Sequence, residues 1–346
     1  MDFRLTDDQR ALRQGIRELL EGRFGREALR AAVDRADGRV GSGRTADGKR
    51  AAEGLPAVDR GDGKARTTEG KRAGGGARVL DRDLWRELGA AGFFALRLPE
   101  AEGGVGQGLP EAVLAFEEAG RVLLPGPLIA THLAAGAVAG AATGETVVTS
   151  VDGGLVEWLD DADVVRGNAG GAEPLASVDP LTPLHRLPVG TGRRPEDGAL
   201  RAPRTPDAPL VSLLTAAEQL GSAARTCGTA VQHARTREQF GQPIGAFQAV
   251  QHLCADMLVR VEVARAAVYA ASVTADPVDI AAARLLADEA AVRGARDCLQ
   301  VYGGMGFTWE SDVHLHLKRA WIRACRAGGA ARSEEELADD LTAGTA

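Results

Sequence analysis

The sequence has few aromatic residues, few cysteines and no excess of positive charge. Phe, Trp and Tyr together make up 4% of the 346 residues, and there are four cysteines, Cys227, Cys254, Cys298 and Cys325. These cysteines lie far apart and show no Cys-x-x-Cys spacing, which excludes the common zinc signatures and a framework of close disulfides. We therefore expect reduced, mostly buried thiols in a cytoplasmic protein.

The charge balance and the lack of long hydrophobic runs exclude two further classes of protein. The net charge is −7 and the pI is about 5.5, whereas a nucleic-acid partner would need a basic surface. The Ala/Gly-rich stretch from Leu128 to Ala142 is too short and too weakly hydrophobic for a membrane span, and the charged start MDFRLTDDQRALRQ does not resemble a signal peptide. With 45% hydrophobic residues, the chain is expected to be a soluble globular protein of two or three domains.

The N-terminal part of the chain predicts helices separated by one segment of different composition. Thr6 precedes two acidic residues and a helical stripe of leucine and isoleucine, which is typical of an N-capped helix. Residues 36–77 contain no aromatic residue, many glycines and charges of both signs, and we expect a flexible, solvated insertion there. Helical patterns return in LDRDLWRELG and from Pro110 to about Leu124. We predict an N-terminal helical domain over 1–144.

Two further regions follow. Between 145 and 208, the short apolar runs TVVTSV, GLVEWL, ADVVRG and LHRLPVG are separated by Gly, Pro, Asp and Asn, which predicts a reduced β domain with weak strands. The rest, 209–346, is almost continuously helical, and four alanine-rich helical patterns predict a C-terminal four-helix bundle. The first helix is expected to run through REQF to Phe240, and the fourth to span WESDVHLHLKRAWIRACRAGG. The fold class is therefore mainly α with a small β domain.

Two motifs in the last third of the chain each allow two interpretations. LQVYGGMGF places Gly303 and Gly304 after an apolar run; they could end a helix with a left-handed backbone, or bring the backbone flat against a large ligand. In RTREQFGQPIG, the guanidinium of Arg237 could form two bonds to a pyrophosphate, or serve as the charge partner of a helix C-terminus. His314 and His316 are two residues apart and would point to different sides of a helix, so we expect surface or interface roles and no metal site.

Three stretches taken together, RTREQFGQPIGAFQAVQH, LQVYGGMGF and GFTWESDVHLHLKRA, resemble the acyl-CoA dehydrogenase family. The resemblance extends to the N-terminal stretches MDFRLTDDQ, RLPEAEGGVG and EEAGRVLLPGPL. It implies an acyl-CoA dehydrogenase-like fold, with an N-terminal helical domain, a middle β domain and a C-terminal four-helix bundle, and FAD bound where the domains meet a second subunit.

The same resemblance implies which residues contact the cofactor. The residues that would line the adenine and pyrophosphate half of FAD are Arg237, Glu238, Gln239, Phe240, Phe247, Gln248, Gln300, Gly303 and Gly304. Phe240 and Phe247 are expected to be core residues as well. In this family these contacts reach the flavin of a neighbouring subunit, so the resemblance favours close approach for the glycine pair and implies an oligomer.

The sequence departs from the family at the catalytic base. Oxidation of an acyl thioester requires a carboxylate to remove the α-proton while a flavin takes the β-hydride. Where many relatives have a glutamate in a Tyr-Glu-Gly turn, this sequence has Arg326-Ala327-Gly328, and Ala327 cannot accept a proton. Some relatives place the glutamate on the first bundle helix, where Ala217 falls here. Glu218 is one residue, or about 100°, away; it is either a non-standard base or a polar residue satisfied by a neighbouring helix or by solvent.

The predicted β region also departs from the family. Nothing between 145 and 208 resembles the Thr/Ser-rich turn or the Trp-Ile-Thr-like strand that bond the flavin ring in relatives. This pattern resembles the degenerate, base-lacking subunit of bacterial heteromeric acyl-CoA dehydrogenases. It implies a partner-dependent oxidoreductase of lipid metabolism or fatty acid β-oxidation, acting on an acyl-CoA thioester with a catalytic paralogue and an electron-transfer flavoprotein. A bulky acyl group such as a steroid side chain fits this resemblance. The alternatives are a self-sufficient homo-oligomer using Glu218, and a non-catalytic acyl-CoA- or flavin-binding scaffold.

Overall fold

The computed structural model describes residues 5–41, 80–188 and 207–343. The N-terminal helices are α1 (Asp7–Arg23), α2 (Arg26–Gly41), α3 (Arg82–Ala90), the 3₁₀ turn η1 (Glu100–Glu102), α4 (Leu109–Arg121) and α5 (Leu128–Ala134). As predicted, Thr6 caps α1: its hydroxyl accepts from the Gln9 backbone N–H at 3.2 Å, and the Gln9 side chain accepts from the Thr6 N–H at 3.0 Å. Helix α2 extends to Gly41, past the predicted start of the insertion; 42–77 lie outside the described residues.

A small sheet follows the N-terminal helices. It has five strands in the order β3-β1-β2-β5-β4, namely β1 (Val148–Asp152), β2 (Leu155–Glu157), β3 (Val164–Arg166), β4 (Glu173–Leu175) and β5 (Leu184–Arg186). Strand β3 pairs parallel with β1, and the other pairings are antiparallel. Four of the five strands have three residues, in agreement with the weak strands that the short apolar runs predict.

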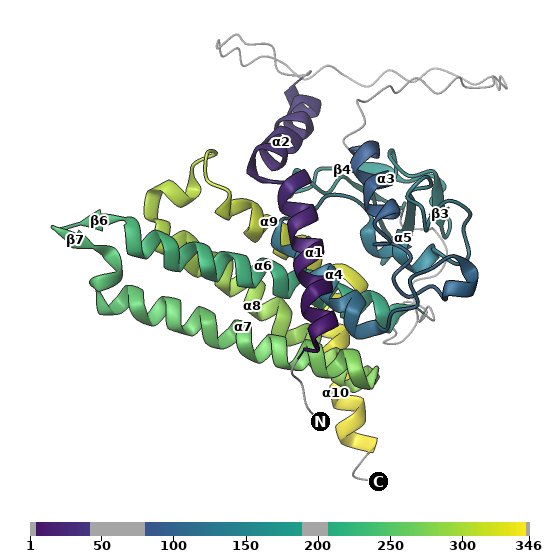
Figure 1. Cartoon of the computed structure of the whole chain (residues 1–346). Coiled ribbons are helices and arrows are strands. Elements are labelled where there is room, and N and C mark those ends of the chain that lie inside the picture. The colour runs from purple at the N-terminus through teal and green to yellow at the C-terminus, as the bar shows by residue number, and fades with distance from the viewer. Residues whose placement is uncertain (1–4, 42–79, 189–206, 344–346) are drawn as a thin grey trace, which may run out of the picture.

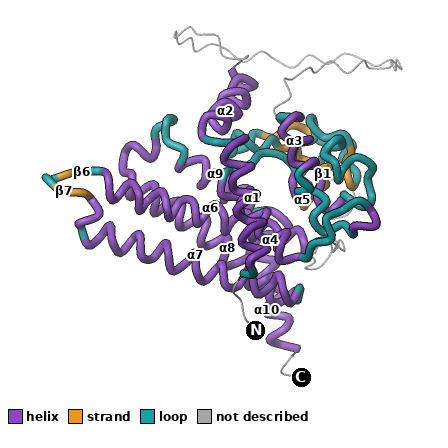
Figure 2. The backbone as a smooth tube through the Cα atoms, viewed as in Figure 1, coloured by secondary structure: helices purple, strands orange, loops and turns teal. Residues whose placement is uncertain are grey.

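The C-terminal part is a helical bundle (Figures 1 and 2). Its helices are α6 (Ala208–Thr236), α7 (Gln248–Thr274), α8 (Pro277–Tyr302), α9 (Val313–Ala324) and α10 (Gly329–Ala343), with the 3₁₀ turns η2 (Ile244–Ala246), η3 (Gly303–Phe307) and η4 (Arg326–Gly328). Helix α8 contacts α6, α7, α9 and α10. The fold is therefore mainly helical with a small β sheet, as expected.

Two predicted helices in this bundle were too long. The first ends at Thr236, and the next residues form a hairpin of β6 (Glu238–Gln239) and β7 (Gln242–Pro243). Its two turn residues, Phe240 and Gly241, have φ of 54° and 78°, which is the backbone that a tight two-residue hairpin requires. The fourth predicted helix is interrupted at η4, where Ala327 has φ 55° and the two following glycines also have positive φ.

Helices α4 and α6 approach each other at two glycines. A Cβ added at Gly120 would lie 2.0 Å from the carbonyl oxygen of Glu218, and one at Gly221 would lie 1.8 Å from that of Glu117. The two backbones are thus in direct contact, which no larger residue would permit. This contact joins the N-terminal helices to the bundle, and one apolar core runs through both, with Phe116 and Leu214 completely buried.

The cysteines and two of the histidines differ in how well their predicted surroundings match this fold. All four cysteines are free; Cys227 and Cys298 are buried and Cys325 is exposed. The surface role expected for the two histidines was wrong, because both are buried: His316 shares a 2.8 Å hydrogen bond with Ser222, and His314 stacks on Trp309. In the described part of the chain, no helix is long and apolar enough to cross a membrane.

Candidate functional site

The residues expected to contact a nucleotide lie at one end of the bundle. Helix α6 ends there, the β6–β7 hairpin projects beyond it, α7 begins there, and α8 ends nearby at η3 (Figure 1). The ring of His233 on α6 stacks on Tyr302 at the end of α8, with centroids 3.9 Å apart. The Ile244 N–H donates to the carbonyl oxygen of Arg237 at 2.8 Å. These contacts hold both motifs at the same tip of the molecule.

The side chains of this tip are mostly exposed. Arg237 is the C-cap of α6, its amide donates to the carbonyl of His233, and the residue is exposed. Glu238 and Gln239 form strand β6, and both are exposed. Phe240, which we expected in the core, is 92% exposed at the hairpin turn; the tight turn projects it away from the other described elements.

The other predicted contacts come from the starts and ends of α7 and α8. Phe247 is the N-cap of α7, half-buried and edge-on to the Phe240 ring at 6.0 Å. Gln248 is the first residue of α7 and Gln300 lies in the last turn of α8, and both are exposed.

The three glycines after α8 lie in different local surroundings. Gly303 has φ 60° and ends the helix, so the helix-stop interpretation is correct for this residue. Gly306 is buried, and a Cβ there would lie 3.0 Å from the Tyr302 side chain. At both Gly303 and Gly304, a Cβ would meet no atom within 4 Å. The positive φ explains Gly303 and packing explains Gly306, but neither explains Gly304, whose backbone is open to approach from outside.

A second region contains the position expected for the base. Ala327 lies in η4, and its backbone N–H donates to Asp152 Oδ2 at 2.8 Å. The cavity beside it measures about 50 Å³, and it is lined by Ser150, Asp152, Leu155, Glu157, Leu184, Ile322, Cys325 and Arg326. Sites for small molecules are usually at least about 300 Å³, so this cavity by itself is too small for a flavin ring or an acyl chain.

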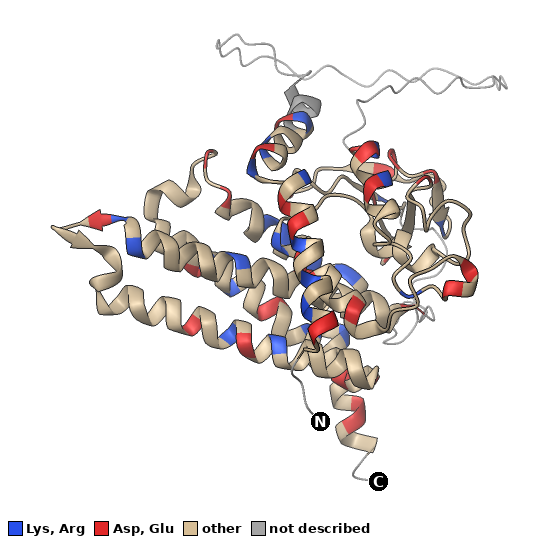
Figure 3. Cartoon of the chain, viewed as in Figure 1, with Lys and Arg blue, Asp and Glu red and all other residues tan. Residues whose placement is uncertain are grey.

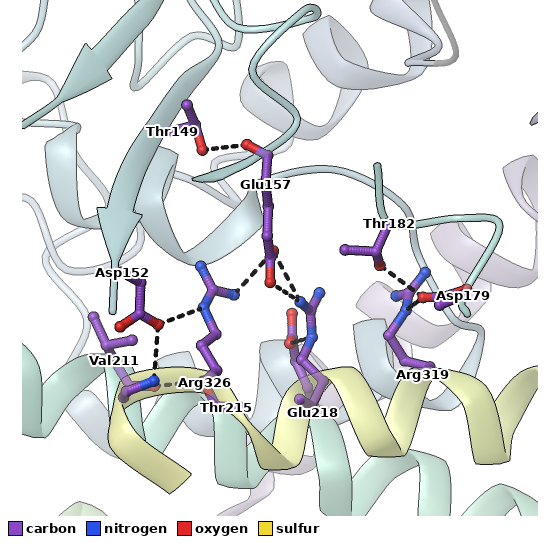
Figure 4. Close-up of polar contacts among 12 residues, drawn as sticks. Thr149, Asp152, Glu157, Asp179, Thr182, Val211, Thr215, Glu218, Arg319 and Arg326 are labelled. Carbon is purple, nitrogen blue, oxygen red and sulfur yellow. Dashed lines mark hydrogen bonds and ion pairs between the residues drawn. The ribbon is translucent and has the colours of Figure 1, made fainter. Parts of the chain in front are cut away.

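Glu218 is held in a buried ion pair. Its Oε2 lies 2.6 Å from Arg323 Nε, in direct ionic contact although without the angle of a hydrogen bond (Figure 4). Arg323 also donates to both carboxylate oxygens of Glu157, at 3.0 and 3.1 Å. Burial alone would lower the pKa of Arg323, but Glu218 and Glu157 raise it above its ordinary value. Glu218 is therefore satisfied by a neighbouring helix, which was the simpler of the two interpretations.

Two more arginines extend this network along one side of α9 and η4. Arg326 lies 3.6 Å from Glu157, and Arg319 pairs with Asp179. Burial opposes the charge on Glu157, yet Arg326 and Arg323 hold its pKa below the usual value. This network was not predicted from the sequence. The available signal was the spacing of Arg319, Arg323 and Arg326, which are four and three residues apart and so share a helical face.

The chain matches two family models and several known proteins. The acyl-CoA dehydrogenase C-terminal domain model matches residues 212–336, and the N-terminal domain model matches 71–146. The chain is 38% identical over 262 residues to the acyl-CoA dehydrogenase IpdE2 of Mycobacterium tuberculosis, covering 68% of this chain and 80% of that protein.

Solved structures have the same fold. The ChsE4-ChsE5 complex from Mycobacterium tuberculosis is similar with a TM-score of 0.72 and 23% identity, over 99% of both chains. The Tcur3481-Tcur3483 steroid ACAD is similar with a TM-score of 0.72 and 23% identity, over 98% of this chain and 99% of that chain. The chain therefore belongs to the acyl-CoA dehydrogenase family.

FAD is the cofactor of this family, and the described residues fit its two halves differently. The tip of the bundle offers an exposed guanidinium at Arg237, an exposed amide at Gln300 and an open backbone at Gly304, which suit a pyrophosphate and an adenine. Next to Ala327, the small cavity and the ion pairs of Glu157 and Glu218 do not suit a flavin ring.

Proposed function

We propose that this chain is one subunit of a heteromeric, FAD-dependent acyl-CoA dehydrogenase. It would contribute the adenine and pyrophosphate half of the FAD site to a catalytic paralogue, which supplies the base and the contacts to the flavin ring. The complex would catalyse α,β-dehydrogenation of an acyl-CoA thioester and pass the electrons to an electron-transfer flavoprotein or a similar acceptor.

The observation that carries this proposal is that neither position where the family places its base holds a free carboxylate. Ala327 has no acidic group, and its backbone N–H is bonded to Asp152. Glu218 is 5% exposed and in contact with Arg323. A general base must reach the proton that it removes and be free to accept it. The Glu218 carboxylate instead contacts the buried guanidinium of Arg323.

The exposed tip supports the proposal that this chain contributes half of an FAD site to a partner. Arg237, Glu238, Gln239, Gln248 and Gln300 are all exposed there, as are Gly303 and Gly304. Phe240 leaves 92% of its surface uncovered. Contact with a second chain and its bound nucleotide would cover this aromatic side chain.

Helix α7 offers a surface for that second chain. Its outward side has exposed apolar residues, Leu258, Val259, Val263 and Val273, of which Val259 is 60% exposed. These residues extend from the middle of α7 to its last turn, and α7 runs along one side of the bundle (Figure 2). The similarity to the ChsE4-ChsE5 complex and to a steroid acyl-CoA dehydrogenase favours a heteromeric partner and a bulky acyl group.

The test is co-expression with an acyl-CoA dehydrogenase encoded next to this chain. We expect a yellow complex with the absorbance of bound FAD, which reduces a dye when acyl-CoA is added. The purified single chain should be colourless and inactive. A single chain that is yellow and turns over acyl-CoA would refute the proposal, and a complex that binds flavin but oxidises no acyl-CoA would indicate a scaffold.

Two matched variants locate the contribution of this chain. Arg237→Gln should lower the FAD content of the complex, because a charge-assisted contact to phosphate is worth about 1.5–3 kcal/mol. Arg235→Gln changes a neighbouring exposed arginine and should leave the FAD content unchanged. Glu218→Gln should retain turnover in the folded complex. Loss of turnover with intact folding would instead identify Glu218 as the base of a self-sufficient enzyme.

A further inference from the structure

A pocket of about 300 Å³ lies where α1 crosses α4, α6 and α7, away from both regions discussed so far. It is lined by Arg13, Arg17, Glu117, Glu118, Arg121, Gly221, Ala224 and Arg265. Four arginines from three helices therefore surround one space. Figure 3 shows Lys and Arg gathered in the middle of the molecule, where α1 passes over the bundle.

The pocket exists because α6 presents only small residues at this point. Gly221 and Ala224, one helical turn apart, form its α6 wall. Gly221 is required for the close contact of α6 with the Glu117 carbonyl. Ala224 is half-buried, and its methyl group leaves the space beyond it unfilled. A longer side chain at 224 would occupy the pocket.

The two carboxylates in the wall already have close partners. Glu118 is bound by two nitrogens of Arg17, at 2.9 and 2.5 Å. Glu117 accepts the Tyr269 hydroxyl at 2.6 Å and lies 3.5 Å from Arg265. These contacts leave little of either negative charge to neutralise the remaining arginines.

The arginines in the wall are compensated unevenly: Arg265 also contacts Glu262, whereas Arg121 has no carboxylate closer than 3.7 Å among the described residues. Arg121 lies 3.8 Å from Glu118 and 3.7 Å from Glu21, which is half exposed on the rim. Arg13 makes no hydrogen bond or ion pair within the described chain. The Nε atoms of Arg121 and Arg265 are buried without a hydrogen-bond partner. Burial, and then the charge of Arg17, lower the pKa of Arg121. A buried donor without an acceptor is costly, and an oxyanion in the pocket would supply one.

We propose that this pocket binds a small oxyanion with at least two negative charges, such as a phosphate ester, a pyrophosphate or a polycarboxylate. Arginine guanidinium groups bind phosphate and carboxylate oxygens through paired N–H donors. A volume near 300 Å³ is at the lower limit for small-molecule sites, so it suits a compact ligand and not a dinucleotide. The proposal does not depend on a partner chain.

The experiment uses the full chain and titrates pyrophosphate or citrate at constant ionic strength, with sodium chloride as the reference salt. A ligand that binds only the folded state raises the melting temperature. We expect a saturable rise with one or both anions, confirmed as a one-site isotherm by calorimetry. A response to pyrophosphate alone would indicate a phosphate ligand, and a response to citrate alone a polycarboxylate. An equal shift in sodium chloride would overturn the proposal.

Matched variants assign the binding to the pocket. Arg13→Gln removes an arginine that pairs with no described residue, so the fold should be retained, and affinity should fall about tenfold. Ala224→Met should block binding by filling the space. Arg296→Gln, an exposed arginine on α8, is the charge control. This control variant should bind the anion normally. Unchanged binding in both pocket variants would refute the site.

Discussion

Replacing Arg323 by methionine should cost far more stability than replacing either of its carboxylate partners. Arg323 is 2% exposed and contacts Glu218 and Glu157. In Arg323→Met, Glu157 still has Arg326 at 3.6 Å, but Glu218 is left buried with no cation in contact among the described residues. An uncompensated buried charge costs about 3–5 kcal/mol. We expect the free energy of unfolding to fall by about that amount.

The partner variant has a smaller expected cost. In Glu218→Gln, Arg323 keeps both contacts to Glu157, so about 1–2 kcal/mol should be lost. The double variant removes both charges at once. It should be more stable than Arg323→Met alone, because no buried carboxylate is left unpaired. The coupling between the two changes should therefore exceed about 1 kcal/mol.

Urea unfolding followed by circular dichroism, on the parent chain and these three variants in one buffer at pH 7, measures all four values. Additive losses, or an Arg323→Met variant as stable as Glu218→Gln, would show that Arg323 and Glu218 are not paired. That result would also remove the argument against Glu218 as a base, because a carboxylate that is not paired with Arg323 would be free to accept a proton.

Three other predictions test the fold and the tip. Gly221→Ala should lower the stability of the fold by about 1–3 kcal/mol, because its Cβ would collide with a carbonyl of α4. The control Gly228→Ala, in open space on the same helix, should be neutral or stabilising. Equal melting temperatures for the two variants would refute the close contact. Burial lowers the pKa of His132 to about 4 and of His316 to about 3. Below about pH 6.5 the unfolded chain therefore binds protons that the folded chain does not. Stability should fall as the pH drops from 6.5 to 5, by up to about 1.4 kcal/mol per pH unit for each histidine. Replacing both histidines by glutamine should flatten this slope, and a urea midpoint that does not change with pH would contradict the prediction. Phe240→Ser should change stability by less than about 0.5 kcal/mol yet reduce recovery of the partner in co-purification; full recovery would exclude the hairpin from the interface.

Much of the fold could be predicted because its signals are local. The capping residues around Thr6 and the alanine-rich helical patterns of the bundle identify their helices without reference to the rest of the chain. The hairpin at Phe240 was missed because strong helical propensity on both sides hides a turn whose defining feature is two consecutive residues of positive φ. At Ala327 the helical pattern gave no sign of the interruption, although the family resemblance implied a turn there.

The buried charges could not be predicted in this way. In the sequence, Glu218 is a polar residue in an alanine-rich helix, and its partner Arg323 lies more than 100 residues away. Glu157 comes from a strand of the small sheet. Whether a carboxylate is a free base or one partner of an ion pair depends on which helix packs beside it. That information is absent from any local pattern.

The amino-acid sequence by itself determined the family, the order of helical and strand regions, and the absence of an acidic residue at 327. These follow from residue identity, hydrophobic period and motif spacing, which act over a few residues. Only the tertiary structure decided that Glu218 is neutralised by Arg323, that the tip with Arg237 is uncovered, and that four arginines surround one pocket. These depend on contacts between distant segments, because electrostatic and packing energies are set by distance in space and not by separation along the chain.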